Sequence, residues 1–305
     1  MANIAVIILT YNEQKHIERA LASVQSFARE VFVIDSFSTD ATPQLAAARG
    51  AVVLKHEFIN YARKFQWALD NAPITADWIF RLDADEIVEP DLAAEIEAKL
   101  PNLPPDVAGI NVNRKTIFLG RWIKHGGRYP MYVLRIWRRG QGRIENRWMD
   151  EHTIVEGGRV INFSGGFADH NLNDLSFWTT KHNQYATREA IEVLNESYGL
   201  FESDLALLQQ KNSSQAKVKR WLKMGLFYKV PFWLAATLFF VYRYVFLCGF
   251  LDGIEGLMYH FLQGYWYRFL VGAKVLEFRR ALAKIPDPET KIVELSRLTG
   301  FQLQP

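Results

Sequence analysis

The chain has 305 residues, of which 49% are hydrophobic and 23% are charged, so it is long enough for one large globular domain or two modest ones. Its formal net charge of +3 is too small to indicate a nucleic-acid partner. A single cysteine excludes an internal disulfide and a cysteine-based metal site, which fits a reducing compartment. The first residues, "MANIAVIILTYNEQ", lack a basic leader and a small-residue cleavage site, so we do not expect a signal peptide.

Strand and helix patterns alternate through the first hundred residues. The run "IAVIIL" at 4–9 is apolar and β-branched throughout, as in a parallel strand that is covered on both faces. A helical spacing follows over 12–27, with Ile17, Leu21 and Val24 on one face. The alternation continues with strands at 30–36, 51–57 and 77–86 and with helices at 39–50, 62–72 and 89–100. This order predicts an open α/β sheet that binds its ligand at the carboxyl ends of its strands.

Polar side chains follow three of these strands, at the point where each strand ends. They are Thr10-Tyr11-Asn12, Asp35-Ser36 and Asp83-Ala84-Asp85. Because parallel strands end at the same edge of a sheet, we expect these groups to converge on one site.

Carboxylates dominate the last of these clusters, where Asp83, Asp85 and Glu86 end an apolar run. Their hard oxygens suit Mg²⁺ or Mn²⁺, which keep coordination positions open for phosphate oxygens. Such a metal would neutralise a leaving diphosphate. The alternative is that the three carboxylates only cap the helix that follows and complement its dipole.

The loop after the first strand, "TYNE", contains no glycine-rich turn, and the chain has no P-loop motif. This argues against a typical dinucleotide-dependent enzyme or nucleoside triphosphatase. Thr10, Tyr11 and Asn12 are candidates for binding a base or ribose, and Asp35 is placed to hydrogen-bond either one. The alternatives are that Asn12 caps the next helix and that Asp35 caps the next turn.

Three blocks resemble the inverting glycosyltransferases of family 2, which have the GT-A fold: "VIILTYNEQKHIERALASV", "EVFVIDSFSTDAT" and "WIFRLDADE". The resemblance covers about the first 100 residues and is greatest to bacterial enzymes of lipopolysaccharide-core and exopolysaccharide assembly. It implies that the nucleotide pocket is lined by Thr10, Tyr11, Asn12, Glu13 and Asp35.

The resemblance also implies that Asp83 and Asp85 act on ribose, metal and diphosphate, with Asp85 as the direct metal ligand. It places Lys64 near the nucleotide. The sequence departs from many relatives at Phe37, where they have glycine, which affects how this loop packs.

An inverting transfer needs a base that deprotonates the acceptor hydroxyl. The family has this base in an acidic motif, and the matching segment here is "RWMDEHTIVEGG". We predict Glu151 as the base and Asp150 as the second candidate; the alternative is a solvated surface turn. His170 is a further candidate for a metal or phosphate contact, against a structural role.

Short β runs with many basic residues fill the segment after residue 105, and the pattern turns helical from about Leu175. Arg128, Arg135 and Arg138 are either contacts to acidic acceptor groups or phosphates, or part of a solvated basic face. We therefore expect a GT-A catalytic domain at 1–174, with a nucleotide-sugar half (1–100) and an acceptor half (105–174). A helical, membrane-associating region would occupy 175–305.

The apolar run at 230–251 is about long enough to span a bilayer, which takes roughly 20 residues. However, Arg243 lies inside it, and a central arginine costs about 2.5–3.5 kcal/mol on insertion scales. The basic stretch at 211–229 would attract anionic lipid. We favour helices that lie in or dip into the cytoplasmic leaflet. The alternatives are a transmembrane or re-entrant hairpin, and an apolar pair that packs on the catalytic domain or forms a dimer face.

The sequence therefore predicts an α/β protein with a GT-A fold, a mixed, mostly parallel sheet and a C-terminal helical region. Its expected activity is metal-dependent inverting transfer of a sugar from a nucleotide-sugar, by family habit UDP-linked, to a lipid-linked glycan. The setting would be bacterial lipopolysaccharide or other cell-surface polysaccharide synthesis at the cytoplasmic face of the inner membrane. The alternatives are a sugar nucleotidyltransferase and a non-catalytic membrane-associated partner that retains the fold.

Overall fold

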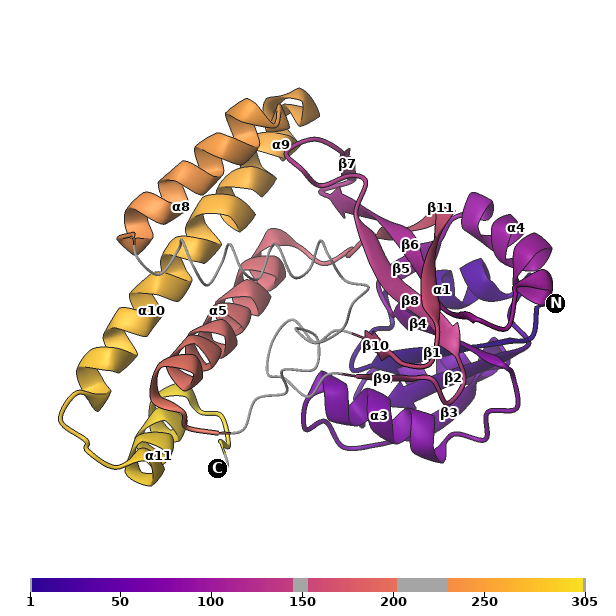
Figure 1. The fold of residues 1–305 in the computed structure, drawn as a ribbon, viewed down its shortest axis with the longest axis horizontal. Coiled ribbons are helices and arrows are strands. Elements are labelled where there is room, and N and C mark those ends of the chain that lie inside the picture. Colours follow the sequence, from indigo (N-terminus) through magenta and orange to yellow (C-terminus); the bar gives the residue numbers. More distant parts are fainter. Residues whose placement is uncertain (1, 145–152, 202–229, 304–305) are drawn as a thin grey trace. The chain divides into compact units, whose positions relative to one another are not determined.

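The computed structural model describes residues 2–144, 153–201 and 230–303 (Figure 1). These residues form two compact units, one made of the described residues up to Leu172 and the other beginning at Asn173.

The first unit is built on a large mixed sheet. Its strands are β1 (Ile4–Thr10), β2 (Glu30–Asp35), β3 (Val52–Lys55), β4 (Trp78–Asp83), β5 (Glu86–Val88), β6 (Val107–Phe118), β7 (Arg121–Ile123), β8 (Tyr132–Arg138) and β11 (Arg159–Asp169). They lie in the order β3-β2-β1-β4-β8-β6-β11-β5, and β7 pairs with β6. The first four strands in this order run parallel, as do β6 and β11, whereas β8 is antiparallel to both of its neighbours. This mixed sheet with helices on its faces is the predicted arrangement.

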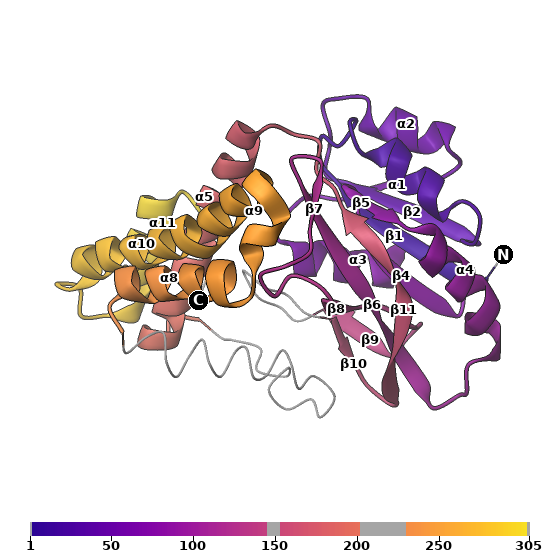
Figure 2. The same cartoon turned by 90° about the horizontal axis from the view of Figure 1, so that it is seen from above.

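Helices cover both faces of the parallel half of the sheet (Figure 2). They are α1 (Ile17–Val24), α2 (Thr42–Ala48), α3 (Tyr61–Asn71) and α4 (Pro90–Lys99). Successive residues of β1 point to opposite faces, since the side-chain period of a strand is two. Ile4, Val6 and Ile8 pack in the core shared with α1 and α4, and the residues between them pack against α3. This two-sided burial explains why β1 is apolar at every position but its last.

The first helix begins later than the spacing predicts, at Ile17 instead of residue 12. Residues 12–16 form a loop, because Asn12 has a left-handed backbone with φ of 55° and the N–H of His16 bonds to the carbonyl of Glu13. The loop leaves the polar residues after β1 at the sheet edge, and does not wind them into a helix.

A separate antiparallel pair is formed by β9 (Gly142–Ile144) and β10 (Thr153–Val155). The stretch 145–152, which connects them, lies outside the described residues. Gly142 is required in β9, since a Cβ atom there would lie 2.3 Å from the ring of Trp137.

The second unit has a helical core made by α5 (Leu175–Tyr198), α10 (Tyr267–Leu282) and α11 (Pro288–Thr299). Its buried residues include Ile191, Leu194, Phe278 and Leu295. Asp174 caps the start of α5 by accepting the N–H of Phe177 at 2.8 Å, which satisfies a backbone donor at the helix end. The helix predicted from about residue 175 is confirmed.

An aromatic helical segment leads into α10. It consists of α8 (Phe232–Val241), η3 (Tyr242–Phe246), η4 (Gly249–Asp252), α9 (Gly253–Tyr259) and η5 (His260–Trp266). Among the described residues, no single helix has both the length and the apolar composition to cross a bilayer. Taken together, the helices Phe232–Phe246 and Gly249–Leu282 meet that test, but they are bent by 72° where they join.

Candidate active site

The ends of β1 and β2 form one hydrogen-bonded cluster. Thr10 and Asp35 are partners in the β1–β2 ladder, and the Thr10 hydroxyl donates to Asp35 Oδ1 at 2.9 Å. The carboxylate of Asp35 also accepts from the N–H of Ser38 at 2.8 Å and from its hydroxyl at 2.5 Å. Asp35 is fully buried, so in this state it organises the loop after β2. Its predicted contact with a base or ribose stays a prediction.

Lys64 reaches this cluster from α3. Its Nζ donates to the carbonyl oxygen of Thr10 at 2.8 Å, and only 2% of the residue is exposed. Desolvation by burial lowers the pKa of Lys64 to about 8, and the nearby carboxylate of Asp35 only partly opposes it. Lys64 therefore lies beneath the end of β1 with a charge that is easily removed, and its place near a nucleotide stays a prediction.

The depressed pKa predicts a pH-dependent stability that a Lys64→Met variant lacks. Between about pH 8 and the usual lysine pKa of 10.5, the unfolded chain binds a proton that the folded chain has lost. The free energy of unfolding should therefore rise as the pH is raised through this window. The added stability should be absent below pH 8, where Lys64 is protonated in both states. We expect a rise of about 2 kcal/mol between pH 7.5 and pH 9.5, relative to Lys64→Met.

Urea denaturation at the two pH values measures this difference. Thr10 keeps a partner in the variant, because its carbonyl also accepts the N–H of Ser36 at 3.0 Å. Lys55→Met, at the exposed end of β3, is the matched control and should behave like the wild type. Equal pH dependence in wild type and Lys64→Met would contradict the assignment.

The loop after β1 is tied to the loop after β2. The N–H of Asn12 donates to the Ser38 hydroxyl at 2.8 Å, and Asn12 Oδ1 accepts the N–H of Thr39 at 2.9 Å. Tyr11 and Phe37 are left 59% and 58% exposed. Phe37 has φ of 56°, a left-handed backbone that costs a non-glycine residue roughly 1–2 kcal/mol. Glycine, which the family resemblance leads us to expect at this position, would be less strained there.

The acidic turn between β4 and β5 is organised by an arginine from β8. Arg135 donates to Asp83 Oδ2 at 3.1 Å and to Glu86 Oε1 at 2.5 Å, and it is 7% exposed. Glu86 is 1% exposed and accepts the N–H of Asp83 at 2.8 Å through its other oxygen. Arg135 also packs against the ring of Phe167. Arg135 is therefore buried against the acidic turn as its ion-pair partner, and it does not belong to a solvated basic face.

The pKa values of the two carboxylates in this turn are shifted in opposite directions. Burial opposes ionisation of Asp83, but the guanidinium groups of Arg135 and Arg81 outweigh it and hold the pKa of Asp83 well below its usual range. Burial raises the pKa of Glu86 to about 8, although Arg135 opposes that rise, and the charge of Asp83 adds to it. Asp83 is thus the anion of the pair, and Glu86 and Arg135 hold it in place.

Asp85 points to the segment that follows β11. Asn171 Nδ2 donates to Asp85 Oδ2 at 2.9 Å, and the N–H of His170 donates to the Asp85 carbonyl at 3.0 Å. Arg19, from α1, donates to the carbonyl of His170 at 2.9 Å. Burial, with the charge of Arg19, lowers the pKa of His170 and so favours the neutral imidazole, the form that binds metals. A backbone hydrogen bond thus makes Asp85 and His170 neighbours, and their roles as metal ligands stay predictions.

The donor set suits a hard divalent cation. Mg²⁺ in phosphate-transfer sites is held by one or two carboxylates, with water and substrate phosphates completing its shell. Asp85 would supply such a carboxylate and His170 a neutral nitrogen, whereas Asp83 is paired with Arg135. No group of three His, Cys, Asp or Glu side chains that could hold a metal is found within the described residues.

Two predicted features lie elsewhere. Glu151 and Asp150 are outside the described residues, in the stretch that connects β9 to β10. Arg138 donates to the backbone carbonyls of Val107 and Pro104 at 2.7 and 3.0 Å, so it supports the sheet.

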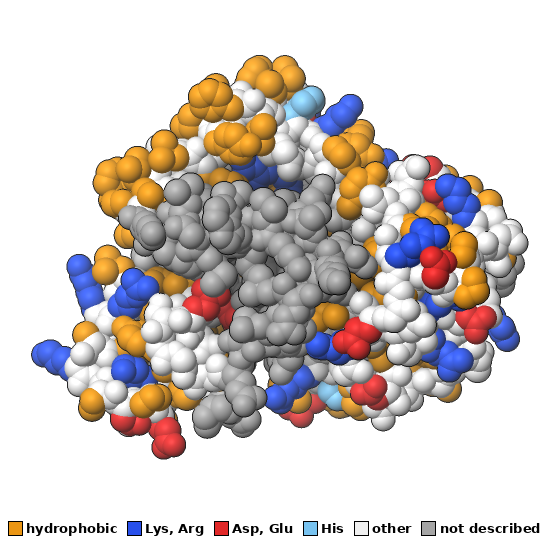
Figure 3. All heavy atoms as spheres, in the orientation of Figure 1, with side chains coloured by type: hydrophobic (Ala, Val, Ile, Leu, Met, Phe, Trp, Pro, Cys, Tyr) orange, Lys and Arg blue, Asp and Glu red, His pale blue; other side chains and the backbone are white. Residues whose placement is uncertain are grey.

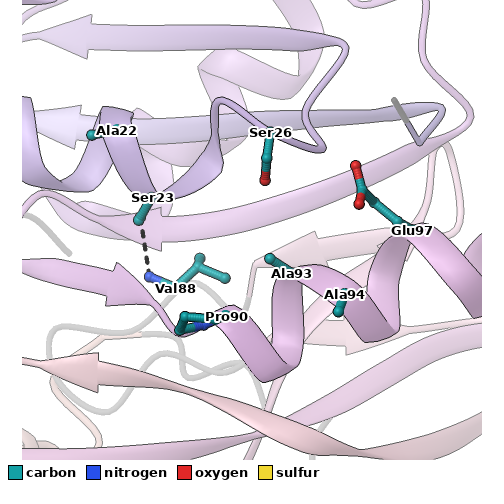
Figure 4. Close-up of a pocket in the computed structure, with 8 residues that line it drawn as sticks. All are labelled: Ala22, Ser23, Ser26, Val88, Pro90, Ala93, Ala94 and Glu97. Atoms are coloured by element: carbon teal, nitrogen blue, oxygen red, sulfur yellow. Dashed lines mark hydrogen bonds between the residues drawn. The ribbon is translucent and has the colours of Figure 1, made fainter.

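A shallow hollow lies between α1 and α4 (Figure 4). Small side chains and the carboxylate of Glu97 line it, and Ser23 accepts the N–H of Val88 at 3.1 Å on its wall. None of the predicted site residues lines this hollow, and we assign no ligand to it.

Residues 5–167 of the chain, more than half of its length, match the model of "Glycosyl transferase family 2". The chain belongs to glycosyl transferase family 2. Its match includes the three strand ends that carry Thr10, Asp35 and the acidic turn, together with all of β6 to β10.

This family 2 chain is also similar to an uncharacterised glycosyltransferase of Rickettsia bellii, with 40% identity over 94 residues. That match covers 31% of each protein, so it spans about a third of the relative's length. Among solved structures, a mannosyltransferase of Pyrobaculum calidifontis in complex with GDP-Man and Mn²⁺ has 14% identity and a TM-score of 0.43, covering 98% of this chain and 81% of that one. Glucosyl-3-phosphoglycerate synthase of Mycobacterium tuberculosis, in complex with Mn²⁺, UDP and its product, has 16% identity and a TM-score of 0.41, with coverage of 66% and 81%.

The family 2 site contains one buried link that we did not predict from the sequence. His16, which is 1% exposed, lies with Nδ1 2.6 Å from Glu13 Oε2 and accepts the N–H of Leu172 at 2.9 Å through Nε2. It thereby joins the loop after β1 to the segment that carries His170 and Asn171. The signal in the sequence was only the spacing Glu13-x-x-His16, which fits a helical turn equally well.

Proposed function

We propose that this family 2 member is an inverting glycosyltransferase that uses a nucleotide-sugar donor and a divalent metal. The observation that carries the proposal is the convergence of Thr10, Lys64, Asp83 and Asp85 at the carboxyl ends of β1 and β4, which are adjacent strands of one parallel sheet. Ligands of open α/β sheets bind at this edge.

Asp85 and His170 would hold Mg²⁺ or Mn²⁺ against the donor diphosphate. The bound metal would neutralise negative charge on the leaving group. Asp83, kept anionic and fixed by Arg135, would accept hydrogen bonds from the donor. Tyr11 and Asn12 would bind the base or ribose, with Glu13 holding His16 beneath that loop.

Glu151 is the proposed base, with Asp150 as the second candidate. Its carboxylate would take the proton of the acceptor hydroxyl while the hydroxyl oxygen bonds to the sugar C1 and the C1–O bond to the diphosphate breaks. Attack from the face opposite the leaving group inverts the configuration at C1.

The variant Glu151→Gln tests the base. A positioned base contributes about 10²–10⁴-fold, so we expect transfer to fall by that factor while donor binding is unchanged. Asp150→Asn is the neighbouring control and should lose less activity. Transfer at the wild-type rate in Glu151→Gln, with loss in Asp150→Asn, would move the role to Asp150.

The acceptor we propose is a lipid-linked saccharide of bacterial lipopolysaccharide or exopolysaccharide synthesis, met at the cytoplasmic face of the inner membrane. The support is the apolar, aromatic hairpin of the second unit and the basic stretch that precedes it in the sequence. An enzyme whose acceptor is in a bilayer benefits from lying on that surface.

A donor panel tests the proposal as a whole. Full-length protein in detergent would be given UDP-, GDP- and dTDP-sugars with Mn²⁺ and a lipid-linked saccharide extract, and release of the nucleoside diphosphate would be followed. Release with one donor, and its loss on chelation, is the expected result. Pyrophosphate formation from a nucleoside triphosphate and a sugar phosphate would instead identify a nucleotidyltransferase.

A further inference from the structure

The polarity of the hairpin Phe232–Leu282 is reversed relative to a protein surface in water. Residues 230–267 contain three charged side chains, Arg243, Asp252 and Glu255. Arg243 and Asp252 are 7% and 3% exposed, and His260 is fully buried. By contrast, Phe246 is 72% exposed and Ile254 is 62% exposed. Charged groups inside and apolar groups outside are what a hydrocarbon environment favours.

The first helix of the hairpin is apolar on all its sides. Nine of the ten residues of α8 are apolar, yet only Ala235 and Ala236 are buried. Trp233 and Leu238 are 53% and 57% exposed. A helix that is apolar all round belongs in a core or in lipid, and α8 is not in a core. A second protein copy would cover one stripe of such a helix, whereas lipid solvates every exposed side.

The chain turns back before it could cross a bilayer. The ring of Phe232 lies 5.1 Å from that of Phe269, and Phe232 occupies the place that a side chain at Gly272 would take, 2.4 Å from the would-be Cβ. The returning chain at Phe269 and Gly272 therefore lies beside the start of the hairpin. Helix Phe232–Phe246 rises at most roughly 22 Å at 1.5 Å per residue, against a hydrocarbon core of about 30 Å.

The turn at the far end is held from within. A Cβ at Gly249 would lie 2.6 Å from the ring of His260 and 3.0 Å from the carbonyl of Arg243, so the turn packs directly on these two buried residues. Along the hairpin, Arg268 lies over the ring of Phe239 at 3.7 Å. Arg243, Asp252 and His260 thus face the inside of the hairpin. Glu255 is half-buried, and the other exposed groups of the tip are mainly apolar.

We propose that this hairpin inserts its tip, residues 246–257, into one leaflet of a lipid bilayer and returns without crossing it. Apolar side chains gather over α8 and α9 in Figure 3, where Figure 1 places the tip. This insertion rests on the proposed function, for which it specifies the contact with the membrane. Its test needs neither donor nor acceptor, so the insertion and the transferase activity can each fail without the other.

Vesicle flotation of the full-length protein tests the insertion. Vesicles of phosphatidylethanolamine and phosphatidylglycerol should carry the wild type, and Phe246→Glu/Ile254→Glu should partition at least about tenfold more weakly. The matched control is Val293→Glu/Leu298→Glu, since both residues are exposed on α11 of the same unit. It should float like the wild type.

Flotation of Phe246→Glu/Ile254→Glu at the wild-type level would overturn the proposal. So would a wild type that does not float and forms a dimer that the same substitutions dissociate, because a second copy would then cover the tip. Loss of flotation in the tip variant alone, with a wild-type circular dichroism spectrum, supports it.

Cys248, the single cysteine of the chain, lies within the tip, so a label attached to it reports how deeply the tip inserts. A polarity-sensitive fluorophore attached to it should shift to the blue with vesicles and be quenched by lipids spin-labelled in the acyl chain. In unlabelled protein, a membrane-impermeant maleimide enclosed in the vesicles should not alkylate Cys248. Alkylation from inside would show that the hairpin crosses the bilayer, against the proposal.

Discussion

Replacing Asp85 with asparagine is expected to lower sugar transfer about 10³-fold, because a metal-held leaving group accounts for several kcal/mol of transition-state stabilisation. The fold should survive the change. Asparagine keeps an oxygen that can accept from Asn171, and the bond from His170 goes to the Asp85 backbone carbonyl. Nucleoside diphosphate release and circular dichroism of the same preparations measure the two effects.

Asp70→Asn is the matched control for this variant. Asp70 is on α3, where it accepts from Gln66 at the surface, so the same chemical change there should leave transfer unaltered. An Asp85→Asn enzyme that keeps wild-type transfer and the same Mn²⁺ dependence would remove Asp85 from the metal site.

Arg135→Met is expected to give the largest loss of stability of any single change in the acidic turn. Removing one partner of a buried ion pair leaves an uncompensated buried charge and typically costs about 3–5 kcal/mol. Here the uncompensated charge would be that of Asp83, the anion of the pair. Arg138→Met on the same strand is the control, and its loss should be smaller because Arg138 bonds to neutral carbonyls. Urea denaturation of the two variants measures the difference.

The double variant Arg135→Met/Asp83→Asn separates stability from function. The N–H of residue 83 can still donate to Glu86, and no unpartnered anion is left at position 83. Most of the lost stability should return, while donor affinity should stay reduced, since the anionic oxygen at position 83 is gone. Equal losses of stability in Arg135→Met and Arg138→Met would contradict the buried-pair account.

The strands and their polar ends were predictable, since each rests on local signals. "IAVIIL" is apolar at every position because β1 is covered on both faces, and Asp83 and Asp85 follow β4 directly. The start of α1 was predicted five residues too early. Helical spacing alone cannot predict that Asn12 bonds to the loop after β2. This bond holds the backbone of Asn12 in a left-handed conformation.

Long-range partners could not be predicted in the same way. Arg135 is 52 residues from Asp83, and nothing in the spacing of basic residues distinguishes it from Arg138. His16 bonds to Leu172 across 156 residues. These contacts depend on which strands become neighbours, and β8 is inserted between β4 and β6 by the fold as a whole.

The most direct test of the account is calorimetric titration of UDP, GDP and dTDP into the full-length protein, with Mn²⁺ and with a chelator. We expect one nucleotide to bind with Mn²⁺, and its binding to weaken strongly on chelation and in Asp85→Asn. Equal binding with and without the metal, or no binding of any nucleotide by a folded protein, would contradict the claim that this sheet edge holds a metal-bound donor diphosphate.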